Sequence, residues 1–214
     1  MQFTLTFLYH IYLMFNLFFL YWKKLNYTSM YTQAQLLKIM LEDARRKTLK
    51  GIEGVTKEQL FDAPLPNEEC IGSYLMHLGE CDLGWYEEMT GDKVPQELKD
   101  KNYYGVWIGC PKEEAHPPKE APEIEDYISA ITDARKPILD FLDKATDSDL
   151  DEVIIAYKGH GDIKMTKRDI INRLISHENH TRGQMFLLMR MGGIKTNFNN
   201  IWGIRLEHNM RNPK

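Results

Sequence analysis

Apolar side chains recur every three or four residues in four long segments of the chain, a spacing that places them on one face of an α-helix. The segments are residues 32–50, 67–90, 124–145 and 166–193. Glycines follow the first, second and last segments, as is usual where helices end. The pattern therefore predicts an all-α protein in which four helices form an antiparallel bundle.

Local signals predict how three of these helices begin or bend. Thr166 followed by Asp169 matches a capping box at the start of the last helix. Asn67 is expected to cap the second helix. Pro137 lies inside the third helix, where a proline removes one hydrogen bond and crowds the preceding turn, so we expect a kink or break near Arg135.

Two connections between the helices stand out. Residues 91–123 form a long loop with five prolines, and its apolar stretch 103–108 is expected to cover part of the bundle. Residues 153–157 have an extended pattern and precede a glycine-rich turn at 159–162, which predicts a small hairpin before the last helix.

Both ends of the chain extend beyond these helices. Residues 3–22 carry no charge and include nine aromatic side chains. This segment is long enough for a membrane anchor, which would leave the bundle on the cytoplasmic side. Alternatively, residues 1–29 are not native, and translation begins at Met30; we favour this second interpretation. The domain then comprises residues 30–214, and its apolar C-terminal tail is expected to lie over the bundle and to fray after Asn209.

Composition narrows the class of protein. The 214 residues are 43% hydrophobic and 27% charged, which suits one globular domain. The net charge of −4 and the absence of a basic block argue against nucleic-acid binding. Cys70, Cys81 and Cys110 lack the spacing of a disulfide framework, which fits a cytoplasmic protein, and we interpret them as small hydrophobic residues.

One histidine lies in the middle of the apolar face of the last helix. His177 shares this face with Thr181, and His180 follows three residues later on a neighbouring line of the helix. A buried imidazole needs a polar partner, because an unsatisfied group in a core costs about 1 to 3 kcal/mol. His177 is therefore either a core histidine with a hydrogen bond to another helix or a metal ligand.

The sequence around His177 resembles a known family signature. Residues 177–184 read HENHTRGQ, which is similar to the H-E-x-H-H-R-G-Q motif of the DinB/YfiT-like superfamily of four-helix bundles. Residues 71–91, IGSYLMHLGECDLGWYEEMTG, resemble the helix of that family that carries the first histidine. The likeness covers roughly residues 31–193 and implies a divalent metal, typically zinc or nickel, held by three histidines.

The expected ligand set departs from the family pattern at one position. By resemblance, His77 and His177 match the first two ligands, but the third falls on Thr181, whose hydroxyl is a poor ligand beside imidazole. The missing ligand can be His180 after a modest helix rotation, Glu80, or an acidic residue of the first helix. Of these candidates, we expect His180 to be the third metal ligand. Gln184 is expected to contribute to binding of the metal by contacting a residue that holds the ion, without binding the ion itself.

The resemblance implies metal-assisted chemistry. Relatives include transferases and isomerases that use low-molecular-weight thiols, so one hypothesis is a thiol-dependent transferase or hydrolase that acts on a small molecule. The alternative is a metal-free bundle that binds a small ligand or dimerises, its ancestral metal site lost at Thr181. A homodimer is also implied by the resemblance.

Overall fold

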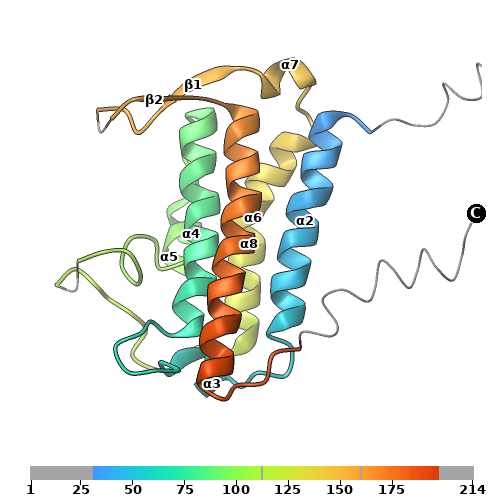
Figure 1. Cartoon of the computed structure of the whole chain (residues 1–214). Helices are drawn as coiled ribbons and strands as arrows, with labels where there is room; N and C mark the ends of the chain where they lie inside the picture. Colours follow the sequence, from blue (N-terminus) through green and yellow to red (C-terminus); the bar gives the residue numbers. More distant parts are fainter. Residues whose placement is uncertain (1–30, 112, 160, 198–214) are drawn as a thin grey trace, which may run out of the picture. The chain divides into compact units, whose positions relative to one another are not determined.

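Four long helices form a bundle in the computed structural model, which describes residues 31–111, 113–159 and 161–197 (Figure 1). These helices are α2 (Gln33–Gly51), α4 (Ile71–Thr90), α6 (Ile124–Leu142) and α8 (Lys167–Met191). Shorter elements connect them: α3 (Lys57–Phe61), α5 (Gln96–Lys101), α7 (Asp147–Leu150), β1 (Val153–Ala156) and β2 (Ile163–Thr166). The predicted all-α four-helix bundle is confirmed.

The direction of each helix follows from the residues that meet at each end of the bundle. One apolar cluster joins the beginnings of α4 and α6 to the end of α8, and a second joins their opposite ends to the beginning of α2. Helices α4 and α8 are therefore antiparallel, as are α2 and α6, whereas α4 and α6 run in the same direction (Figure 1). The long loop between α4 and α6 makes this possible, because it returns the chain to the end where α4 began.

The helix starts agree with the sequence in one case and differ in another. Thr166 Oγ1 accepts the backbone N–H of Asp169 at 3.1 Å, which confirms the predicted capping box of α8. The predicted cap at Asn67 is wrong: Asn67 has a left-handed φ of 64°, and α4 begins only after Cys70, whose sulfur accepts the N–H of Ser73. Asparagine tolerates this conformation, so the chain is still turning at Asn67.

Helix α6 runs through Pro137 without the break that we considered, and it ends at Leu142, three residues earlier than predicted. The hairpin before α8 is confirmed, with Val153 paired to Thr166 and Ala156 to Ile163 in an antiparallel ladder. In the long loop, Trp107 is buried in the core, as expected for its apolar stretch.

Several expectations concern residues outside those described. They are the interpretation of residues 1–29, the tail beyond Asn197, and His160, which we expected in the hairpin turn. Among the residues that the structure does describe, no helix combines the length and the apolar character needed to cross a bilayer.

A layer of four charged side chains lies across the middle of the bundle, one from each long helix. Arg45 of α2 and Arg135 of α6 are paired with Asp82 of α4 and Glu178 of α8, and all four are buried. Asp82 accepts hydrogen bonds from both guanidinium groups at 2.8 to 2.9 Å. Glu178 accepts from Arg45 at 3.0 Å and lies 2.7 Å from Arg135.

The backbone also contributes to this layer. Arg45 donates to the carbonyl oxygen of Ile131, and Arg135 donates to that of Leu41 at 3.0 Å. The hydroxyl of Thr48 donates to Glu178 at 2.8 Å. Two positive and two negative charges thus compensate each other, as buried charges require, and the layer separates the two apolar clusters. We call these four residues, Arg45, Asp82, Arg135 and Glu178, the charged layer.

Removing one carboxylate of the charged layer should destabilise the protein strongly. Asp82→Ala leaves two buried guanidinium groups short of a partner, so we expect the free energy of unfolding to fall by about 3 to 5 kcal/mol in urea denaturation. Asp133→Ala is the control, because it removes only a partly exposed ion pair with Lys101 and should cost less than about 1 kcal/mol. Equal losses in the two variants would contradict a stabilising role of the layer.

The charged layer should also make the free energy of unfolding depend on pH. Burial by itself raises the pKa of Glu178, but Arg45 and Arg135 outweigh burial and hold this pKa at about 2. The folded pKa lies below the ordinary value of 4.5, so the stabilisation is complete above about pH 4.5 and is lost as the pH falls towards 2. We expect a loss of about 3 kcal/mol over this range. The matched variant Glu178→Gln should show a flatter profile, and parallel profiles would refute the assignment.

Candidate metal centre

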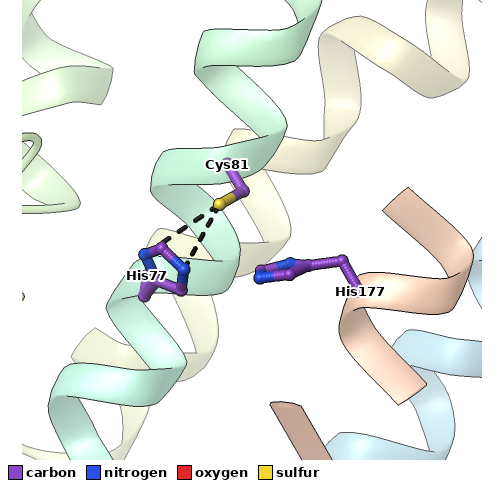
Figure 2. Close-up of side chains that lie close together, drawn as sticks. All are labelled: His77, Cys81 and His177. Carbon is purple, nitrogen blue, oxygen red and sulfur yellow. Dashed lines mark hydrogen bonds between the residues drawn. The ribbon is translucent and has the colours of Figure 1, made fainter. Parts of the chain in front are cut away.

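Three side chains with metal-binding atoms converge where α4 and α8 face each other (Figure 2). His77 and Cys81 lie one turn apart on α4, and His177 comes from α8. One ligand atom from each lies within 4.8 Å of the other two, and among the described residues these three form the group that meets this condition. The two imidazole rings are 5.1 Å apart between centroids and are inclined by 72°.

The charged layer explains why these side chains meet. Asp82 directly follows Cys81, and Glu178 directly follows His177. Because both carboxylates point into the bundle interior, the residues before them lie about 100° away around each helix. This rotation carries Cys81 and His177 to the contact between α4 and α8, where they are half-buried.

Glu80 fixes the orientation of His77. One of its carboxylate oxygens lies 3.2 Å from Nδ1 of His77, and the other accepts the backbone N–H of Gly105 at 2.8 Å. Sγ of Cys81 lies beside the same ring, 3.5 Å from Nε2 and 3.9 Å from Nδ1. The hydrogen bond to Cys81, followed by that to Glu80, raises the pKa of His77 to about 10.

His177 has a different environment. Burial lowers its pKa, and the neighbouring positive charge of His77 lowers it further. Its Nε2 lies 3.4 Å from Oγ1 of Thr181, which is buried one turn further along α8. The hydroxyl at the position where the resemblance implies a third histidine therefore contacts the imidazole.

The donor atoms suit a zinc-like ion. For tetrahedral zinc with bonds of 2.0 to 2.3 Å, a nitrogen and a sulfur ligand lie about 3.6 Å apart. Nε2 of His77 and Sγ of Cys81 are separated by 3.5 Å, and because the sulfur also lies 3.9 Å from Nδ1, the imidazole must turn for Nε2 to point to a shared ion. A histidine that binds metal through one nitrogen commonly donates the other N–H to a carboxylate. Glu80 occupies that position beside Nδ1 of His77.

A cavity of about 350 Å³ opens beside this group. His77 and Cys81 form part of its wall, and Trp85, Tyr104 and Tyr157 supply aromatic surface. Tyr157 is held by its backbone N–H, which donates to Glu88 at 2.7 Å. Segments from the long loop and the hairpin thus flank an open space next to the donor atoms, large enough for a small molecule.

The structure brings together only part of the predicted ligand set. His77 and His177 meet as expected, whereas His180 and Gln184 lie on the exposed side of α8, outside the group. Cys81 takes part instead, although its sequence context suggested a small hydrophobic residue. Its spacing of four residues from His77 on a helix is the signal that points to it.

The profile of the DinB superfamily matches residues 40–185 of the chain. The chain belongs to the DinB superfamily. Similar folds occur in a conserved protein from Enterococcus faecalis, with 16% identity, a TM-score of 0.57, and coverage of 76% of this chain and 98% of that one. A DinB-like protein from Bacillus cereus shows 20% identity and a TM-score of 0.50, and the match covers 73% of this chain and 87% of the other. No curated protein matches the chain.

Titration of His177 should report its contact with His77. In metal-free protein we expect an NMR-derived pKa below 6.5 for His177, because burial and the nearby charge both disfavour its protonated form. His77→Gln should raise this pKa towards 6.5. Arg173→Gln, which removes a weaker positive influence, should raise it less. An unchanged His177 pKa in His77→Gln would contradict the contact.

Proposed function

We propose that this DinB-superfamily protein binds a divalent metal through Nε2 of His77, Sγ of Cys81 and the imidazole of His177. The observation that carries the proposal is the convergence of these three donors beside a cavity. Two imidazoles and a thiolate favour zinc among common divalent ions, and nickel remains the second choice from the resemblance. In this arrangement, Cys81 takes the role that the Thr181 substitution removed from α8.

We further propose that the protein is a metal-dependent transferase or hydrolase that uses a low-molecular-weight thiol or water on a small molecule. Catalytic zinc sites typically have three protein ligands and leave one position open. A metal held there lowers the pKa of a bound water or thiol, so that a nucleophile exists near neutral pH.

The residues of the chain have separate tasks in this proposal. Glu80 holds His77 in place, and the aromatic walls at Trp85, Tyr104 and Tyr157 receive the substrate. The volume of about 350 Å³ restricts the substrate to a small molecule.

A second candidate function is a metal-free bundle that binds a small ligand. One observation favours it: each imidazole already has a polar neighbour within the chain, since His77 contacts Glu80 and Cys81, and His177 contacts Thr181. A buried polar group needs no ion once it is satisfied in this way. The cavity would then serve for binding alone.

Metal analysis separates the two candidates. Protein purified without a histidine tag should contain about one equivalent of zinc or nickel by mass spectrometry, because three donors form a specific site. His77→Ala, Cys81→Ser and His177→Ala should each lose this metal. Glu80→Gln should bind it about 10- to 100-fold more weakly, because the orientation of His77 is lost.

Two exposed residues of α8 provide the matched controls for this experiment. His180→Ala and Gln184→Ala should retain the metal, since both side chains lie outside the group. Loss of metal in His180→Ala with retention in Cys81→Ser would restore the ligand set predicted from sequence. No binding at saturating zinc or nickel would leave the metal-free candidate.

A further inference from the structure

A second cavity, separate from the metal centre, lies between α2 and α6. It has a volume of about 590 Å³ and largely apolar walls. Leu49 of α2 and Ile128 and Leu139 of α6 line it, and Ile52 and Val55 close the end beyond α2. Its size falls in the range of pockets that bind ligands, about 300 to 1,000 Å³. We call this space the α2–α6 groove.

The last described residue of the chain lies at one end of the α2–α6 groove. Asn197 donates its backbone N–H to the carbonyl oxygen of Gly51 at 3.3 Å, and its side-chain amide donates to Glu53 at 3.2 Å. Glu53 is part of the groove wall. The chain therefore enters its C-terminal segment, residues 198–214, directly beside the apolar space.

The sequence of that segment has the spacing of a groove-binding peptide. Phe198, Ile201 and Trp202 follow one another at i, i+3 and i+4, and Leu206 continues the series at i+8. Peptides that bind apolar grooves use anchors at this spacing. Polar asparagines occupy the two positions between Phe198 and Ile201, whereas Ile204 falls outside the series.

The length of the C-terminal segment and its point of attachment also match the α2–α6 groove. From Glu42 to Lys50, the groove follows nine residues of α2, which is about 14 Å at 1.5 Å per residue. In the helical conformation that this anchor spacing requires, the eight steps from residue 198 to residue 206 span about 12 Å, close to the length of the groove. Because Asn197 anchors the segment at the groove, its effective concentration there is in the millimolar range, and even weak intrinsic affinity suffices for occupancy.

We propose that the α2–α6 groove is the docking site of the C-terminal segment of the same chain, with Phe198, Ile201 and Trp202 as its anchors. The segment covers apolar surface that α2 and α6 leave open between them. The groove lies on the side of the bundle away from the α4–α8 contact.

Photo-crosslinking in the full-length chain tests the proposal. With Trp202→p-benzoylphenylalanine, irradiation should yield crosslinks to residues 42–55 or 124–139, mapped by mass spectrometry. Mixing isotopically labelled and unlabelled protein distinguishes crosslinks within one chain from those between chains. Ile128→Lys places a charge in the groove and should lower the yield at least threefold. Leu187→Lys, on the exposed side of α8, should leave it unchanged.

A second measurement does not depend on the photochemistry. Combined replacement of Phe198, Ile201 and Trp202 by serine should open the groove and raise the fluorescence of the apolar dye ANS several-fold, while circular dichroism confirms the helical fold. Crosslinks between chains would assign the groove to a second copy. Crosslinks to another face, no crosslinks, or unchanged ANS fluorescence would overturn the proposal.

Discussion

The compensated charges at the centre of the bundle constrain every long helix at once. Each of α2, α4, α6 and α8 contributes one member of the charged layer, and each member is buried against partners from other helices. Apolar contacts are non-directional and tolerate small rotations, whereas bidentate guanidinium–carboxylate pairs do not. The layer therefore sets the rotation and height of the helices, and the apolar clusters above and below it supply most of the stabilisation.

The arrangement of the candidate metal centre depends on this constraint. Cys81 and His177 each precede a member of the charged layer in sequence, so the ion pairs that aim Asp82 and Glu178 inwards also aim these donors at each other. A carboxylate that points inwards cannot rotate without leaving a buried charge unpaired, which is costly. The donors are thus positioned by the interior of the bundle, and not only by contacts at the site itself.

The helices could be predicted from sequence because apolar periodicity and capping residues are local signals, as Thr166 shows. The charged layer could not, because Arg45 and Asp82 look in sequence like ordinary solvent-facing charges, and only the packing of four helices reveals them as partners. For the site, family resemblance pointed to His77 and His177. Cys81 was missed because the cysteines lack the spacing of a disulfide framework, which in the sequence indicates small hydrophobic residues.

Glu80 has two partners with different roles, since one oxygen orients His77 and the other holds the backbone of the long loop at Gly105. The position of the loop and the orientation of the imidazole are consequently linked through a single carboxylate. A ligand that fixes the ring would favour the loop conformation in which Gly105 donates to Glu80, and displacement of Gly105 would change the environment of the ring. By thermodynamic reciprocity, each event must strengthen or weaken the other to the same extent.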